Sequence, residues 1–168
     1  MGCGNGVTSG GETCDDSNNS DNDSCPADCR IDACTAVATS QRFVQVRFEP
    51  PLGALVAGIT VLVDYPEGKV DLPGNGTSFP AGTISGTVPG AQLSVNDLNF
   101  STNGHAVRVT VAGQGGQALP AGQIIRFKFQ DCQGAVPPVA DQFPCTVISA
   151  SDPFLNRVSG VRCFVVVE

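Results

Sequence analysis

The residues best suited to chemistry lie near the N-terminus, where segment 15–23 reads DDSNNSDND. Carboxylate and amide oxygens crowd into this short stretch. Ca²⁺ takes about six to eight oxygen ligands and tolerates irregular loops, so the tract predicts a calcium site. The alternative is a solvated acidic loop that holds no ion. The predicted ligands are Asp15, Asp16, Asn18, Asp21 and Asp23.

Cysteines surround this tract. Residues 1–34 contain almost no apolar side chains, so hydrophobic burial cannot fold them unaided, whereas covalent cross-links can. Zinc binding by these cysteines is less favoured than disulfide formation, because zinc sites favour CxxC pairs and no histidine is nearby. We therefore predict that all the cysteines form disulfides. They are Cys3, Cys14, Cys25, Cys29 and Cys34 in the N-terminal part, and Cys132, Cys145 and Cys163 in the remainder.

The number of cysteines is odd in each part, five before residue 35 and three after it. If all eight pair within one chain, at least one disulfide must join the two parts. We favour such a cross-link, with Cys34 bonded to one of the three C-terminal cysteines. The other outcomes are a free thiol in each part or a bridge to another chain. The connectivity itself cannot be read from the sequence.

The charge divides the chain at the same place. Residues 1–34 carry seven acidic residues against one arginine, a net charge of −6, and residues 35–168 carry a net charge of −1. We therefore expect two parts, an acidic cysteine-rich module over 1–34 and a larger domain over 35–168. Without clustered Lys and Arg, a nucleic-acid partner is not expected. No apolar run is long enough to span a bilayer, and the many cysteines favour an extracellular or cell-surface location.

The larger part alternates apolar and polar residues in short runs that Gly and Pro separate. This period of two predicts β-strands, and the turn-delimited spacing favours a nine-stranded antiparallel sandwich of the mainly β class. Arg47, Arg108, Arg126 and Lys128 fall on the outward faces. Segment 35–41 is expected to be a short join. The expected strands are 43–48, 59–63, 69–72, 84–88, 92–100, 107–111, 125–129, 145–149 and 161–167.

Three short motifs carry a family resemblance: CGNG at 3–6, GETCDD at 11–16 and DSC at 23–25, followed by Cys29. They resemble the cysteine-rich repeat of secreted myxobacterial and related deltaproteobacterial proteins, which is itself similar to the calcium-binding Lin-12/Notch repeat. Ser17 stands where that repeat usually has glycine. The resemblance implies a loop-dominated, disulfide-rich surface module.

The expected fold class is a sandwich or jelly roll, and the remainder of the chain is similar to the cohesin and carbohydrate-binding-module type of nine-stranded sandwich. The similarity lies in GITVLVDY at 58–65 and in LPAG at 119–122, which precedes IIRF at 124–127. It implies a binding or scaffolding domain and not an enzyme. However, the chain has no tryptophan and one tyrosine, Tyr65, which disfavours a sugar-stacking platform.

No catalytic site is predicted. His105 is the only histidine and lies outside any recognisable catalytic motif. The acids available for glycoside hydrolysis occupy expected turns and strand ends, where acids are common. They are Asp64, Glu67, Asp71 and Asp97.

The last strand, CFVVVE at 163–168, is apolar on both faces. It is interpreted either as a central strand buried between layers or as an edge that pairs with a neighbouring subunit. The sequence thus favours a non-catalytic structural or adhesion protein, a scaffold or filament-type subunit that self-associates through strand pairing or head to tail. The alternative is a carbohydrate- or protein-ligand-binding module of a secreted bacterial protein.

Overall fold

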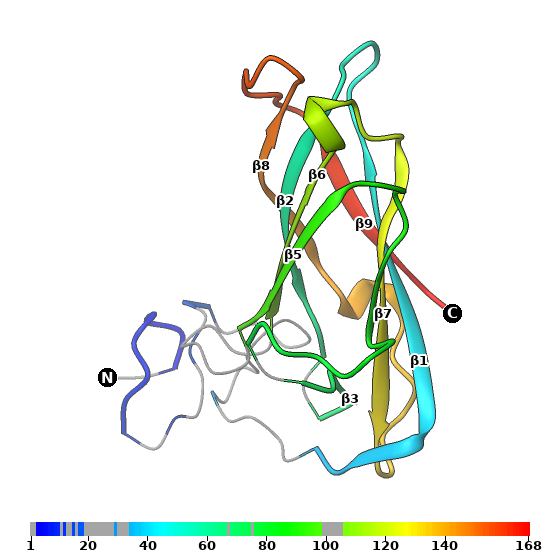
Figure 1. The fold of residues 1–168 in the computed structure, drawn as a ribbon. Helices are drawn as coiled ribbons and strands as arrows, with labels where there is room; N and C mark the ends of the chain where they lie inside the picture. Colours follow the sequence, from blue (N-terminus) through cyan, green and yellow to red (C-terminus); the bar gives the residue numbers. More distant parts are fainter. Residues whose placement is uncertain are drawn as a thin grey trace.

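The computed structural model describes residues 3–10, 12, 15, 17–18, 29, 34–66, 68–74, 76–98 and 106–168. The part from residue 34 onward forms two antiparallel sheets that face each other (Figure 1). The mainly β, sandwich-like fold expected from the sequence is therefore confirmed. Within the described residues the strands are β1 (Ala36–Glu49), β2 (Gly58–Asp64), β3 (Val70–Asp71), β4 (Ile84–Gly86), β5 (Gln92–Asp97), β6 (Ala106–Ala112), β7 (Gly122–Cys132), β8 (Cys145–Ser151) and β9 (Arg162–Val167).

Apart from the consecutive pair β5 and β6, the neighbouring strands of each sheet are distant in the sequence. The first has the order β3-β7-β1-β9, with β4 also paired to β7, and the second has the order β5-β6-β2-β8. Two short 3₁₀ helices, η1 (Gln114–Gly116) and η2 (Ala140–Gln142), lie in the connections before β7 and β8. In the part of the chain that the structure describes, no helix is long and apolar enough to cross a membrane.

Strand β1 shows how the alternating sequence produces the core. Val44, Val46 and Phe48 are completely buried, while the residues between them lie on the outer face of the sheet. The same alternation buries Ile59, Val61 and Val63 of β2. Because successive side chains of a strand point to opposite faces, each strand contributes one apolar row to the space between the sheets.

The join expected at 35–41 is instead the beginning of β1, which starts at Ala36. Ala36 lies opposite Cys132 of β7, and the register then shifts before Gln41 lies opposite Gln130. The segment lacks strong strand-forming alternation, so its pairing with β7 decides its conformation. The adjacent disulfide between Cys34 and Cys132 holds it there.

Strand β9 lies at the edge of its sheet, because it pairs with β1 alone. The interpretation of the last strand as a central one is therefore wrong. The apolar residues of β9 lie on both faces of the sheet. Val165 is buried between the sheets, whereas Phe164 is 38% exposed on the outer face, opposite Arg47. Cys163 of β9 is bonded to Cys145 of β8, which joins the two sheets at this side.

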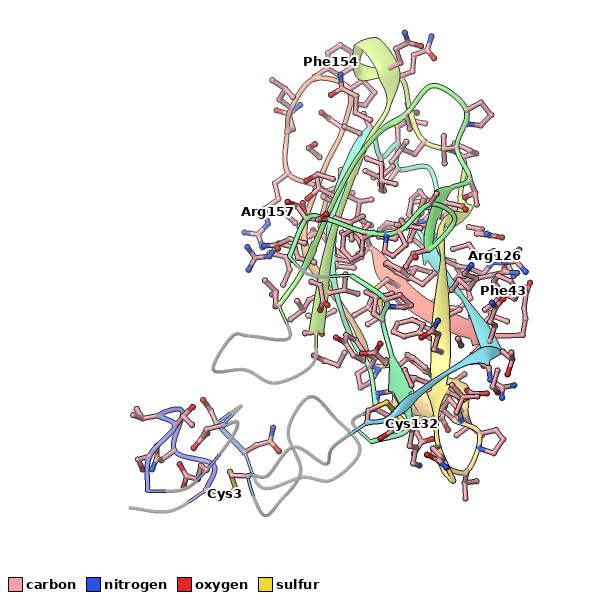
Figure 2. The ribbon with its side chains drawn as sticks, turned by 60° about the horizontal axis from the view of Figure 1, so that its bottom comes forward. Cys3, Phe43, Arg126, Cys132, Phe154 and Arg157 are labelled. Atoms are coloured by element: carbon pink, nitrogen blue, oxygen red, sulfur yellow. A yellow bond between two sulfur atoms is a disulfide. The ribbon has the colours of Figure 1, made fainter. Side chains whose placement is uncertain are left out.

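The outward cations occupy the face that the sequence predicts. Arg108 is exposed, and Arg126 is half-buried with its guanidinium 3.8 Å from the centre of the Phe43 ring (Figure 2). Arg126 also forms an ion pair with Glu168. A cation above an aromatic face is attracted by the ring quadrupole, so these contacts order the outer face of the β7-β1-β9 sheet.

Tyr65 donates a buried hydrogen bond to Oδ1 of Asp97, at 2.9 Å. This bond connects the end of β2 with the end of β5. Burial, and after it the negative charge of Asp97, raise the pKa of Tyr65 far above its ordinary value. The native tyrosine therefore remains neutral at a pH at which an unfolded one ionises.

We expect Tyr65→Phe to destabilise the protein at neutral pH by about 1–3 kcal/mol, because the buried Asp97 carboxylate loses a donor. An unfolded tyrosine releases its proton near pH 10, whereas native Tyr65 does not, so this stabilisation is present below pH 10 and is lost as the pH rises. Urea unfolding at pH 8 and pH 10.5 should show the variant losing less stability than the parent. Equal losses would contradict the assignment, which is direct because Tyr65 is the only tyrosine.

Candidate functional site

The best-defined part of the N-terminal region is a set of backbone bonds around Asp15. This carboxylate is completely buried, and it accepts hydrogen bonds from the N–H groups of Asn5 (3.1 Å), Gly6 (2.8 Å) and Ser17 (2.9 Å). Burial alone would raise the pKa of Asp15, but these donors outweigh it and hold the pKa below its ordinary value. Asp15 therefore ties the CGNG turn to the segment that follows it.

Local backbone geometry explains two residues of this arrangement. Gly6 has φ +80°, and a Cβ atom there would lie 2.6 Å from Oγ of Ser17, so a side chain does not fit. Ser17 itself has φ +71°, a conformation that glycine adopts most easily.

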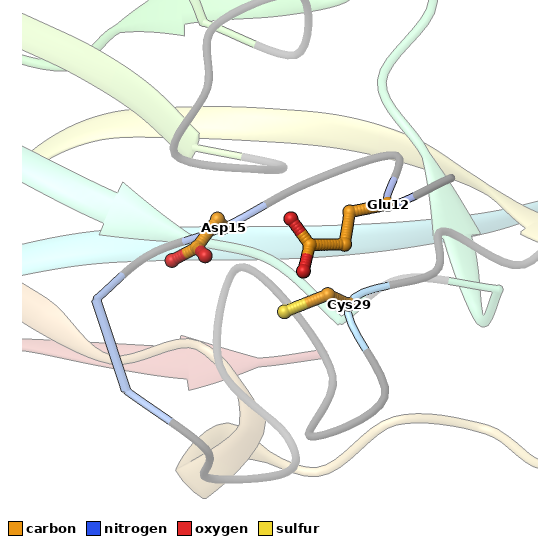
Figure 3. Close-up of side chains that lie close together, drawn as sticks. All are labelled: Glu12, Asp15 and Cys29. Atoms are coloured by element: carbon orange, nitrogen blue, oxygen red, sulfur yellow. The ribbon is translucent and has the colours of Figure 1, made fainter. Parts of the chain in front are cut away.

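Glu12 and Asp15 lie together beside Cys29 (Figure 3). One potential ligand atom from each of the three lies within 4.8 Å of the others, which makes this group a possible metal-binding cluster. Cys29, however, is bonded to Cys3. A disulfide sulfur is not a thiolate ligand, so the usable donors are the two carboxylates. Hard oxygen donors of this kind suit Ca²⁺ better than zinc.

The remaining acceptor capacity of the cluster is limited. One oxygen of Glu12 already accepts from the backbone N–H of Ser9 at 2.7 Å, and Asp15 accepts from three N–H groups. A carboxylate has about four lone-pair sites, so Glu12 can still face a cation, whereas Asp15, on which the backbone N–H of Gly4 also acts, has little capacity left. Further oxygen ligands would have to come from elsewhere.

Only two of the five predicted calcium ligands lie among the described residues. Asp15 is buried in the cluster, and Asn18 is exposed. Asp16, Asp21 and Asp23 lie outside the described residues, so the complete set stays a prediction. Glu12 is not among the predicted ligands, because it precedes the dense Asp and Asn tract at 15–23. The GETCDD motif, which places Glu12 three residues before Asp15, was the available signal.

Three disulfides are described: Cys3–Cys29, Cys34–Cys132 and Cys145–Cys163. The second confirms the predicted cross-link between the two parts of the chain, from Cys34. None of the described cysteines is free, and Cys14 and Cys25 lie outside the described residues. Disulfides at Cys29 and Cys34 exclude the alternative zinc reading of these two residues. Together the three bonds indicate an oxidising environment.

Of the other residues considered for chemistry, Asp97 and Asp71 lie near enough to Tyr65 for their negative charges to raise its pKa. Asp97 is buried against Tyr65, and Asp64 and Asp71 lie at strand ends, at the C-terminal residues of β2 and β3. Tyr65 is 2% exposed, so its ring is not available as a sugar platform. His105 and Glu67 lie outside the described residues.

A groove of ≈ 560 Å³ lies on the outer face of the β5-β6-β2-β8 sheet. It is lined by Thr60, Thr110, Ser149 and Ser151 together with Ile148, Leu155 and Arg157, and the hydroxyls of Thr60 and Thr110 are hydrogen-bonded to each other at 3.0 Å. Arg157 is exposed, and no acid of the described residues forms an ion pair with it. The groove can therefore offer hydrogen bonds and one positive charge to a ligand.

Two loops at one end of the sandwich expose large apolar side chains, and we call this surface the apolar end. Its residues are Leu52, Leu55, Phe154 and Leu155, and the side chain of each is more than half exposed. Asp152 stiffens the second loop, because its Oδ1 accepts from the N–H groups of Phe154 and Asn156. In Figure 2 Phe154 lies at the opposite end of the molecule from Cys3.

Comparison with known proteins gives no relatives. No family model matches the chain, and neither a curated protein nor a solved structure matches it.

Proposed function

We propose that this protein is a non-catalytic structural or adhesion protein of the extracellular space or cell surface, a calcium-stabilised scaffold or filament-type subunit. The observation that carries the proposal is the Cys34–Cys132 disulfide. It joins the acidic N-terminal region covalently to β7, in the middle of a five-stranded sheet. The main chain already connects Cys34 to β1, so the disulfide gives the N-terminal region a second covalent attachment, to the neighbouring strand β7, and a load is shared between two strands, which suits a structural role.

Two surfaces support contact with neighbours. The apolar end presents leucine and phenylalanine side chains to solvent, and exposed apolar patches of this kind commonly mark interaction sites. Both sheets also have free edge strands, β9 and β8 on one side of the sandwich and β5 on the other. These features favour self-association by strand pairing or head-to-tail contact.

Calcium is the cation that the N-terminal chemistry favours. Glu12 and Asp15 provide carboxylate oxygens, and the tract at 15–23 supplies further oxygen donors in the sequence. Bound calcium would offset the mutual repulsion of these carboxylates and restrain a region that has little apolar material to bury.

We expect calcium to stabilise the protein by about 2.7 kcal/mol at a concentration one hundred times its dissociation constant. Calorimetric titration should detect binding, and thermal unfolding should shift upward with calcium and return with a chelator. The variant Asp21→Asn, Asp23→Asn should lose the effect, whereas Asp28→Asn, outside the tract, should keep it. A chain that neither binds calcium nor changes its unfolding temperature would contradict the proposal.

The second candidate is a carbohydrate- or protein-ligand-binding module. The groove lined by Thr and Ser residues and by Arg157 favours it specifically. Binding on a glycan array that Arg157→Ala abolishes would support this second function. Chelator-sensitive assemblies seen by negative-stain electron microscopy would support the first.

A further inference from the structure

Strand β5 is the least protected edge among the described strands. It pairs only with β6, and its sequence, QLSVND, contains no Lys, Arg or Pro. Its one charged residue, Asp97, is buried. Natural edge strands are usually blunted by charge, proline, bulges or shortness. The other edges follow this rule: β3 and β4 have two and three residues, the pairing of β8 contains a register shift, and β9 carries Arg162.

The backbone N–H and C=O groups of Leu93 and Val95 point toward the edge of β5 that does not pair with β6. The N–H of Asp97 points away from β6 and donates to the carbonyl of Gly76 at 2.7 Å, while the N–H of Leu98 donates to Ala106 of β6. Because successive N–H groups of a strand point to opposite sides, those of Leu93 and Val95 share the direction of Asp97. No backbone group in the described residues accepts from either of them outside the ladder.

A groove of ≈ 340 Å³ with a mixed polar and apolar lining lies beside this edge, in the space between β5 of one sheet and β4 of the other. Phe79, Pro80 and Ile84 line it together with Leu93 and Val95. Leu93 is 38% exposed. The inward row of β5 is therefore only partly covered, and an added strand would complete it.

We propose that β5 pairs in antiparallel fashion with β5 of a second copy of this chain, about a two-fold axis that passes through Ser94. In this register Leu93 lies opposite the partner's Val95, and the reverse pair follows by symmetry. All outward N–H and C=O groups of Leu93 and Val95 are then satisfied, and the apolar side chains of both copies enter the two grooves.

The occupant is a second copy because the edge is complementary to itself. The two outward residues flank Ser94 symmetrically, as a closed two-fold contact requires. No exposed charge on β5 opposes its equivalent across the axis, so two copies meet without like-charge repulsion. This contact rests on the scaffold role proposed above and names one interface for it.

A cysteine at position 94 tests the register directly. Residues opposite each other in a non-hydrogen-bonded antiparallel pair have Cα atoms about 4.5 Å apart, and a disulfide requires about 4.4–6.8 Å. Ser94 is exposed and opposite itself in the proposed pair. We expect Ser94→Cys to form a dimer under mild oxidation, in which non-reducing peptide mass spectrometry finds the introduced thiols of the two copies bonded to each other. The control Gln92→Cys faces the partner's Asn96 and should remain at least about tenfold less cross-linked.

A second variant tests the contact without a new cysteine. Leu93→Lys places a like charge on both copies beside the proposed two-fold axis, and we expect it to weaken dimers at least about tenfold in sedimentation velocity. Ile148→Lys, a matched change on the edge strand β8, should leave the dimer unchanged. Circular dichroism establishes that each variant is folded.

The outcomes separate this interface from the broader proposal. If the parent chain assembles while the Ser94→Cys variant forms no cross-link and Leu93→Lys has no effect, the β5 pairing is wrong but the scaffold role survives through another surface. A parent chain that stays monomeric at all concentrations, with calcium and without it, contradicts both. A monomer whose β5 accepts a strand of a different protein also overturns the self-pairing.

Discussion

The double variant Cys34→Ser, Cys132→Ser should lose about 4–5 kcal/mol of stability on the chain-entropy model. The disulfide closes a loop with a sequence separation of 98. The other described disulfides, Cys3–Cys29 and Cys145–Cys163, lie outside that loop. Without Cys34–Cys132, no other described bond restrains this loop in the unfolded chain.

Urea unfolding measures this loss. The matched control is Cys145→Ser, Cys163→Ser, which opens a separation of 18 and should cost about 3 kcal/mol. The Cys34 variant should also show a larger dependence on urea, because its unfolded chain exposes more surface. Limited proteolysis should detect cleavage near 35–41, where β1 begins beside the lost bond. Equal losses in both variants would contradict a loop-length origin.

Phe129→Ala should destabilise the sandwich by about 3–5 kcal/mol. Phe129 is completely buried in β7, and its ring lies 5.2 Å from Tyr65, 5.9 Å from Phe127 and 5.6 Å from Phe143. These neighbours come from both sheets and from the η2 connection. Truncation therefore leaves a cavity between the sheets and removes three tilted aromatic contacts at once.

Chemical unfolding at neutral pH tests this second expectation. Phe164→Ala is the matched control, since this side chain is 38% exposed on the outer face, and we expect a loss below about 1 kcal/mol. Phe129→Leu keeps most of the volume and should lose clearly less than the alanine variant. A similar loss for Phe129→Ala and Phe164→Ala would show that the aromatic cluster does not hold the sheets together.

The strands could be predicted because the alternation of apolar and polar residues that forms them involves residues close together in the sequence. Val107, Val109 and Val111 alternate with polar residues in the sequence, and the structure buries all three in β6. The cross-link from Cys34 could also be predicted, because an odd number of cysteines on each side of residue 35 requires one when all pair within the chain. Its partner, Cys132, could not be chosen, since Cys145 and Cys163 satisfy the same parity.

The candidate site was less accessible to sequence reasoning. A run of acids indicates a cation, but it does not tell which carboxylates face one another. Asp15 was expected to be an ion ligand, and it is also the acceptor of three backbone N–H groups. Glu12 and Asp15 are three residues apart in the chain, and the residue that the fold adds beside them is Cys29, held by its disulfide with Cys3.

The sequence alone determined the alternation that makes nine strands, the outward position of the cations, the local acidity and the need for a covalent joint. Those properties depend on residues that are neighbours in the chain or on their number. Only the tertiary structure decided that β9 is an edge, that β5 is an unprotected one, and that Tyr65 meets Asp97. Such features depend on which strands become neighbours in a sheet, and the hydrophobic pattern of a strand is the same whether one or both of its edges are paired.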